Sequence, residues 1–175
     1  MNMTYKNLLQ ALIIAMSFLV LSTHALATDL VVHIYKPLSH HGNVHVGLHT
    51  SQQSSELFDD INSSDYQAVQ TKTVEATTNK ITITFKNVDE GVYAVSAFHD
   101  TNNDGILNRQ IFPYSGMPLE SFGFSKNHFN SFSMPKFSDG SVEVYGTVTE
   151  ININLQHNHS VAAKQFQQQI MLGSL

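Results

Sequence analysis

Alternation of apolar and polar residues with a period of two is the feature that most constrains how this chain folds. Residues 81–86 are the clearest case, because Ile81, Ile83 and Phe85 alternate with two threonines and a lysine. Successive side chains of a strand point to opposite faces, so the pattern predicts strands with one packed face and one wet face. Comparable strand patterns occur at residues 30–35, 44–49, 92–99, 142–145 and 151–155, and a seventh strand is expected near residues 66–74.

Short strands of this kind, separated by polar turns, predict an all-β fold, an antiparallel β-sandwich of about seven strands. A tight turn is expected at residues 89–91, where an aspartate and a glutamate precede a glycine. A second turn or bulge is expected within residues 146–150, because Val144 and Ile151 have opposite parity. The sandwich domain is predicted to span residues 28–157.

Three stretches lack this alternation. Residues 51–64 are rich in serine and glutamine, and we expect no more than one helical turn there. Residues 100–137 form a long connection for a compact domain, which predicts one long ordered loop, since such loops are usually functional. Residues 158–175 are a polar C-terminal tail that either forms a short amphipathic helix or stays loose. The aromatic residues of the long loop either line a ligand groove or, as we favour, pack as a second small core: Phe122, Phe124, Phe129 and Phe132.

The N-terminal residues have the order of a secretory signal peptide. Lys6 precedes a mostly apolar run over residues 8–21, and Ala25-Leu26-Ala27 follows as a small-x-small site. The pattern predicts a signal peptide over residues 1–27, with cleavage between Ala27 and Thr28. A membrane anchor is disfavoured because a spanning helix needs about 20 apolar residues. We therefore expect a periplasmic or secreted protein without a membrane span after cleavage.

Charge and cysteine content exclude several classes of function. Without Lys6 the chain has eight basic residues against 14 acidic ones, a net charge of −6, and its one arginine is Arg109. Nucleic acid and anionic membrane surfaces are poor partners for such a chain. There is no cysteine, which excludes disulfides, thiol catalysis and thiolate metal sites. The expected partner is a small molecule, a glycan or a protein.

The segment HDTNNDGILN, residues 99–108, places oxygen-bearing side chains at alternate positions of a loop. Calcium takes six to eight oxygen ligands, and oxygens at alternate residues of a curling loop converge on one ion. The glycine at position 105 permits the sharp turn. The candidate ligands are the side chains of Asp100, Asn102, Asp104 and Asn108 and the backbone carbonyl of Ile106. A polar turn is the alternative interpretation, because Asp and Asn favour turns by bonding their own backbone.

The second half of the segment departs from an EF-hand loop. Ile111 stands where a bidentate glutamate closes that kind of site. A more distant carboxylate is therefore needed, and Glu120 is the nearest downstream, with Asp139 as another candidate. We predict a structural calcium ion with the weak affinity of extracellular modules, on the order of 10⁻⁴–10⁻³ M.

Three segments together carry a resemblance to a known family. GVYAVSAFHDTNNDGILN, MPLESFGFSKN and MPKFSDGSVEV resemble the bacterial secreted family called domain of unknown function 2141, over residues 30–155. The resemblance implies a sandwich similar to transthyretin-like and carboxypeptidase-regulatory-like domains, with no established activity. The chain departs from the family pattern at four positions: Asn108, Ser121, Lys126 and Gly140. The regular place of the Glu120 segment after the acidic loop fits Glu120 as the closing ligand.

Nine histidines follow residue 27. His33, His45 and His49 alternate with the aliphatic residues of their strands, and His40-His41 lie between those strands. If the two strands pair, these imidazoles gather on one exposed face, where zinc or copper would accept them. His45 and His49 are about 13 Å apart along a strand and cannot share one ion. A solvated polar face is the interpretation we favour.

The sequence favours a noncatalytic binding or accessory module with a calcium-ordered loop. It contains no nucleophile elbow and no phosphate-binding glycine loop. Two alternatives stay open. One is a histidine-based periplasmic transition-metal binder, and the other is an enzyme acting at the loop face through Asp104 and Glu120.

Overall fold

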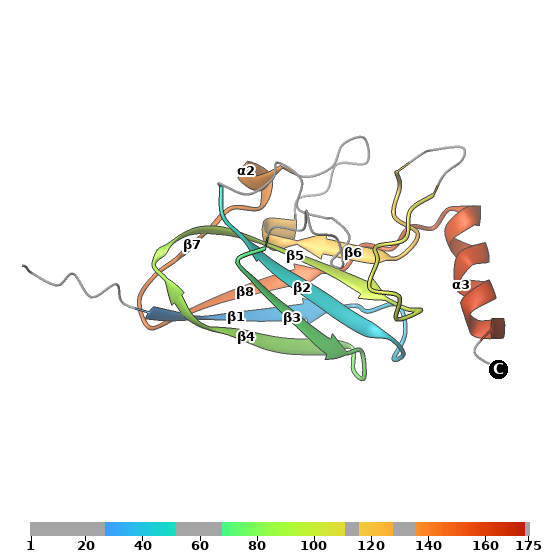
Figure 1. The fold of residues 1–175 in the computed structure, drawn as a ribbon, viewed down its shortest axis with the longest axis horizontal. Coiled ribbons are helices and arrows are strands. Elements are labelled where there is room, and N and C mark those ends of the chain that lie inside the picture. The colour runs from blue at the N-terminus through green and yellow to red at the C-terminus, as the bar shows by residue number, and fades with distance from the viewer. Residues whose placement is uncertain (1–26, 52–67, 111–115, 128–135, 174–175) are drawn as a thin grey trace, which may run out of the picture.

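The computed structural model describes residues 27–51, 68–110, 116–127 and 136–173. Its strands form two facing sheets, so the predicted all-β sandwich is confirmed (Figure 1). The three-stranded sheet has the order β4 (Lys80–Asp89), β1 (Ala27–Tyr35), β8 (Val148–Asn154). The five-stranded sheet has the order β3 (Gln70–Glu75), β2 (Asn43–His49), β5 (Gly91–Asp100), β6 (Ser121–Phe124), with β7 (Val142–Val144) also paired to β5. All pairs are antiparallel except β1 with β8.

The main core lies between the two sheets and consists of the aliphatic residues of the alternating strands. In β1 the buried apolar residues are Leu30, Val32 and Ile34, while their immediate neighbours are only partly covered. Phe85 of β4 is fully buried in the same cluster. The observed register therefore follows the sequence alternation, because a slip by one residue would turn every apolar side chain of a strand outward.

Strand β6 lies inside the stretch that we predicted to be loop, so that part of the prediction is wrong. Its four residues are all buried, and a strand covered on both faces shows no polar alternation. A Cβ added to Gly123 would lie 2.8 Å from Cγ2 of Ile153, so β6 packs closely on β8. Phe122 and Phe124 point the other way, into a second cluster with Phe98. The predicted second small core is thus confirmed for these two aromatics, whereas Phe129 and Phe132 lie outside the described residues.

The turns and helices complete the described fold. The tight turn joins β4 to β5, and Gly146, with φ +74°, lies between β7 and β8. A 3₁₀ turn, η1 (Ser125–Asn127), follows β6, and a short helix, α2 (Phe137–Gly140), precedes β7. The C-terminal tail contains α3 (Val161–Gly173), so the helical alternative holds for that segment. Within the described ranges, no helix is long and apolar enough to cross a membrane.

Two predictions fall on residues about which the structure says nothing. The helical turn expected within residues 51–64 lies almost wholly outside the described residues, as does the signal peptide up to residue 26. The predicted cleavage bond between Ala27 and Thr28 lies at the first bond of β1. Thr28 is buried, and its hydroxyl donates a hydrogen bond to the carbonyl of Gly146 over 2.6 Å. The signal peptide stays a prediction.

Candidate functional site at the loop end of the sandwich

The acidic loop starts at Asp100, the last residue of β5, whose side chain is buried. One carboxylate oxygen, Oδ1, accepts a hydrogen bond from the backbone N–H of Asp104 over 3.2 Å. The other, Oδ2, accepts one from the N–H of Gly105 over 2.8 Å. Positive φ angles at Asn103 (60°) and Gly105 (78°) curl the chain so that these N–H groups face back toward Asp100. The loop is thus wound around a carboxylate at its own start.

The pKa of Asp100 reflects these contacts. Burial alone would raise the pKa, but hydrogen bonds from His45, Gly105 and Asp104 together hold it below its ordinary value. The imidazole Nε2 of His45 lies 3.0 Å from Oδ2 of Asp100, and its Nδ1 lies 2.9 Å from Oγ1 of Thr73. Because a carboxylate only accepts hydrogen bonds, Nε2 of His45 donates to Asp100, while Nδ1 is paired with the Thr73 hydroxyl. Asp100 is therefore an ionised anchor held from both sides.

Two further polar side chains of the loop, those of Asn102 and Asn108, converge on one carboxylate oxygen of Asp104. Oδ1 of Asp104 accepts a hydrogen bond from the N–H of Ile106 over 2.8 Å, which leaves Oδ2 on the inner side of the curl. The amide nitrogen of Asn102 reaches Oδ2 over 2.8 Å, and that of Asn108 reaches it over 3.1 Å. The amide oxygen of Asn108 is buried without a hydrogen-bond partner. The structure therefore brings Asn102, Asp104 and Asn108 together.

Glu120 immediately precedes β6 and ties the two ends of the loop to each other. It is 1% exposed. Its Oε1 accepts hydrogen bonds from the N–H of Thr101 over 2.8 Å and from the Thr101 hydroxyl over 3.0 Å. Its Oε2 accepts one from the N–H of Asn108 over 3.1 Å. Burial raises the pKa of Glu120 to about 7, against the opposing effect of these hydrogen bonds, and the nearby Asp100 adds to the rise.

The two carboxylates proposed to close the ion shell hold backbone groups instead. Glu120 engages Thr101 and Asn108, and Asp139 accepts the N–H of Lys136 at the start of α2 over 2.9 Å. Among the described residues, no group of three or more histidine, aspartate or glutamate side chains is arranged to hold a metal ion. The converging set therefore consists of the two amide groups of Asn102 and Asn108 and one carboxylate, that of Asp104.

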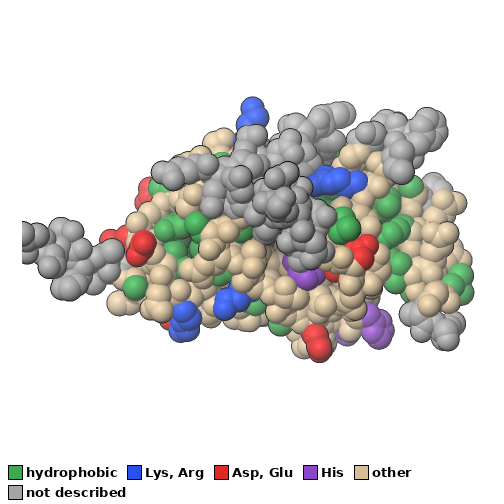
Figure 2. Space-filling view, viewed as in Figure 1, with side chains coloured by type: hydrophobic (Ala, Val, Ile, Leu, Met, Phe, Trp, Pro, Cys, Tyr) green, Lys and Arg blue, Asp and Glu red, His purple; other side chains and the backbone are tan. Residues whose placement is uncertain are grey.

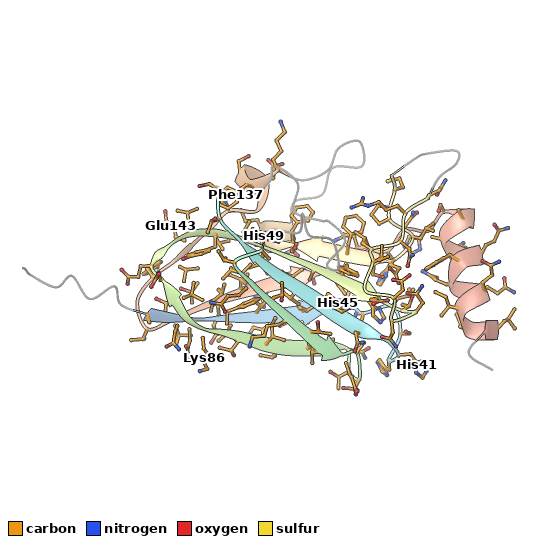
Figure 3. All side chains as sticks on the ribbon, in the orientation of Figure 1. His41, His45, His49, Lys86, Phe137 and Glu143 are labelled. Carbon is orange, nitrogen blue, oxygen red and sulfur yellow. The ribbon has the colours of Figure 1, made fainter. Side chains whose placement is uncertain are left out.

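The histidines do not gather on one face. His33 lies on β1 of the three-stranded sheet, next to Thr82 and Glu150, whereas His45 and His49 lie on β2 of the other sheet. The two strands do not pair, so the condition for a shared face is not met. Figure 3 shows His49 and His45 spaced along β2, with His41 beyond its start. His45 and His49 are buried rather than solvated, so the favoured interpretation of a wet polar face is wrong for these two.

Burial of His49 has a consequence for its ionisation. Its Nε2 lies 2.8 Å from Oγ of Ser96, and burial lowers its pKa to about 4. His45 packs on the ring of Phe98 with 5.0 Å between ring centroids. The outer face of the five-stranded sheet is thus a second, partly polar interior, and its histidines satisfy neighbouring hydroxyl groups.

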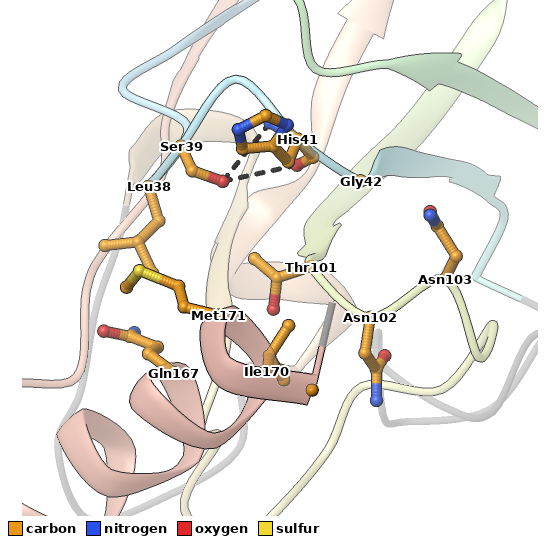
Figure 4. A pocket seen from close by; sticks show the side chains of 11 residues that line it. Leu38, Ser39, His41, Gly42, Thr101, Asn102, Asn103, Gln167, Ile170 and Met171 are labelled. Carbon is orange, nitrogen blue, oxygen red and sulfur yellow. Dashed lines mark hydrogen bonds between the residues drawn. The ribbon is translucent and has the colours of Figure 1, made fainter. Parts of the chain in front are cut away.

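A groove adjoins the acidic loop. Its volume is about 800 Å³. It lies between the connection that joins β1 to β2, the start of the acidic loop and one side of α3 (Figure 4). Among the described residues that line it there is no lysine, arginine, aspartate or glutamate: Leu38, Ser39, His41, Gly42, Thr101, Asn102, Asn103, Gln167, Ile170, Met171 and Gly173.

A comparison with protein families covers both the sandwich and its acidic loop. A model of the family described as an uncharacterized protein conserved in bacteria, DUF2141, matches residues 32–152. The chain belongs to this family. The match covers every strand of the DUF2141 fold at least in part, together with the acidic loop and Glu120. No curated protein and no solved structure gave a match.

Sequence reasoning missed His99 in this DUF2141 domain. Its Nδ1 accepts a hydrogen bond from the N–H of Leu38 over 3.0 Å, and its Nε2 donates to the carbonyl of His41 over 2.7 Å. Burial lowers the pKa of His99 more than these surroundings raise it. His99 thereby fastens the β1–β2 connection to the end of β5. The alternation in β5 could have indicated this role, because it places His99 on the same inward face as Val95 and Ala97.

We expect Asp100→Asn to lower the free energy of unfolding by about 2 kcal/mol, measured by urea denaturation in EDTA. All three described partners of the carboxylate, His45, Asp104 and Gly105, donate to it. The amide of asparagine places its own donor against at least one of them. Asp29→Asn is the matched control, because Asp29 pairs with Lys86 at the surface and such pairs contribute about 0–1 kcal/mol. Equal losses in the two variants would contradict the anchoring role of Asp100.

Proposed function

We propose that this DUF2141 chain is an exported, noncatalytic binding module whose acidic loop takes a structural calcium ion. The N-terminal sequence pattern supports the export step. The observation that carries the calcium proposal is the convergence of Asn102 and Asn108 on Oδ2 of Asp104. Hard cations prefer oxygen ligands, and a loop lined by carboxylate and amide groups supplies them.

The buried amide oxygen of Asn108, which has no hydrogen-bond partner among the described residues, indicates that these residues suit a cation. A buried acceptor without a donor is costly, and a cation is one group that satisfies it. The amide nitrogens of Asn102 and Asn108 face the carboxylate of Asp104. An amide turned by half a rotation about its last bond presents its oxygen at the same place. Asn102, Asp104, Asn108 and the carbonyl of Ile106 would then hold the ion, together with water.

The roles of the remaining predicted ligands follow from their contacts. Asp100 and Glu120 hold the loop backbone through Asp104, Gly105, Thr101 and Asn108. They preorganise the loop, and the ionised carboxylate of Asp100 lowers the local potential for a cation. With one carboxylate directly at the converging point, the site has the charge of a weak extracellular site, with a dissociation constant on the order of 10⁻³ M.

Calorimetry and thermal unfolding with calcium test the proposal. Wild-type protein is expected to release or absorb heat and to gain about 1.4 kcal/mol of stability at about 10 mM calcium. Asp104→Asn keeps the side-chain volume and removes the charge at the converging point, so it is expected to lose both effects. Asp89→Asn, an exposed carboxylate in the β4–β5 turn, is the control and keeps both. Absence of heat and of stabilisation in the wild type would refute calcium binding.

A further inference from the structure

The groove beside the acidic loop has two chemically distinct sides. Figure 4 shows Ile170, Met171 and Gln167 of α3 facing Leu38 and Thr101 across it. We propose that this groove binds an uncharged amphiphile, with an aliphatic chain against α3 and an amide-like or hydroxyl head at the loop. The inference rests on the proposed binding role of the module, but it does not require the calcium ion.

The apolar side is formed by Leu38, Ile170 and Met171. Helix α3 is held at its first turns, where Ala163 is fully buried and its N–H donates to Oγ of Ser160 over 3.1 Å. Its last turns leave apolar side chains uncovered, and Met171 is 67% exposed. Figure 2 shows apolar side chains on this end of the molecule. An aliphatic chain in the groove would remove this surface from water, which is favourable by about 0.8 kcal/mol per buried methylene group.

The polar side offers hydrogen bonds without a net charge. Ser39 and Gln167 contribute a hydroxyl and an amide group to the groove lining. Thr101 and Asn102 also line it, although the Thr101 hydroxyl already bonds Glu120 and the Asn102 amide already bonds Asp104. The bonds between Ser39 and His41 are long, at 3.3 and 3.4 Å, so a ligand that replaces them loses weak bonds only. Without calcium, a charged head would lose its hydration here and meet no charged side chain among the described lining residues, which is unfavourable. An uncharged head that both donates and accepts is the matching chemistry.

The volume fits a molecule of this kind. Ligand sites in proteins measure about 300–1,000 Å³ and combine an apolar lining with a few convergent polar groups. The groove, at about 800 Å³, lies within that range. Because Thr101 and Asn102 line the groove and also belong to the acidic loop, the head group of the ligand would lie next to the proposed calcium site.

Displacement of an uncharged fluorescent dye, N-phenyl-1-naphthylamine, from the whole protein tests the ligand class. The competitors are octanamide, octanoate and octylammonium, which share one chain length and differ in head charge. Octanamide is expected to displace the dye at about tenfold lower concentration than either ion, a difference of about 1.4 kcal/mol in binding. Equal displacement by octanoate or octylammonium would overturn the claim of an uncharged head, and absence of dye displacement by octanamide would overturn the site.

A pair of variants on α3 locates the binding. Ile170→Ser removes an apolar side chain from the groove and is expected to weaken octanamide about tenfold. Leu172→Ser is the matched control, because Leu172 is 64% exposed on the same helix and does not line the groove. Equal weakening in both would show that the helix surface in general binds the ligand, and the groove proposal would fail. Circular dichroism verifies that both variants keep the helix.

Two further measurements distinguish amphiphile binding in the groove from calcium binding and from dimerisation. The titration is run in EDTA and again with calcium, for the wild type and for Asp104→Asn. Octanamide binding that persists in EDTA and in the variant supports the groove even if calcium binding fails. Sedimentation velocity is measured with and without octanamide. If octanamide splits a dimer into monomers, the occupant of the groove is a second copy of the chain, and the amphiphile proposal is overturned.

Discussion

Gly42→Ala is expected to lower the free energy of unfolding by about 3–5 kcal/mol, because it combines a forbidden backbone angle with a backbone collision. Gly42 has φ +81°, and a Cβ placed there would lie 2.2 Å from the carbonyl oxygen of Asp100 and 2.9 Å from Cα of Thr101. Neither atom belongs to a side chain that can rotate away. The substitution must therefore move the β1–β2 connection off the end of β5, which is also where the acidic loop begins.

Gly146→Ala separates the two causes. Gly146 has a similar angle, φ +74°, but nothing lies within 4 Å of an added Cβ. Only the left-handed backbone penalty of about 1 kcal/mol remains. Urea denaturation in EDTA measures both variants against the wild type. If the two losses are equal, the close approach of Gly42 to Asp100 has no energetic weight, and the connection is free to move away.

Most of the strands were predictable from the sequence because they have a local cause. In β4 the alternation of Ile81, Ile83 and Phe85 with polar residues indicates directly which face is buried. β6 was not predictable in this way. Both faces of Ser121–Phe124 are covered, one by β8 and the other by the cluster around Phe98. Its burial depends on segments distant in sequence, which a periodicity argument does not include.

The acidic loop shows the same division between local and distant causes. Side-chain oxygens at alternate residues predicted a curled loop, and Asp100, Asn102 and Asp104 each accept backbone N–H bonds within that curl. The sequence did not indicate which groups each distant carboxylate would bond. Glu120 reaches the loop, but it bonds the backbone at Thr101 and Asn108 rather than joining Asp104. Glu120 directly precedes β6, and the burial of β6 depends on segments distant in sequence.

Two buried groups are expected to give the stability of this protein opposite dependences on pH. The pKa of Glu120 is raised from 4.5 to about 7 by burial. Between these values the folded state keeps a proton that the unfolded state has released, so stability falls as pH rises. The pKa of His49 is lowered from 6.5 to about 4 by burial. Between these values the unfolded state takes up a proton that the fold excludes, so stability falls as pH falls.

Single substitutions reveal each contribution. Glu120→Gln removes the group whose effect weakens the fold toward neutral pH. Its free energy of unfolding is therefore expected to rise more steeply with pH than in the wild type, by about 1.4 kcal/mol per pH unit between pH 4.5 and 7. The glutamine amide still accepts from Thr101 but opposes the N–H of Asn108, which lowers stability at acid pH by about 1–2 kcal/mol. Urea denaturation in EDTA across this range measures both the slope and the offset.

His49→Gln is the opposite case, because it keeps a polar group near Ser96 and removes the proton that the fold excludes. Its stability is expected to lose about 1.4 kcal/mol less than the wild type for each unit of acidification between pH 6.5 and 4. Burial also lowers the pKa of His99 and of His157, and both keep their effect in either variant. The difference between the two pH profiles therefore isolates Glu120 and His49. If the profile of each variant ran parallel to that of the wild type, both groups would titrate in the folded protein as they do in water. Burial would then not shift the pKa of either group.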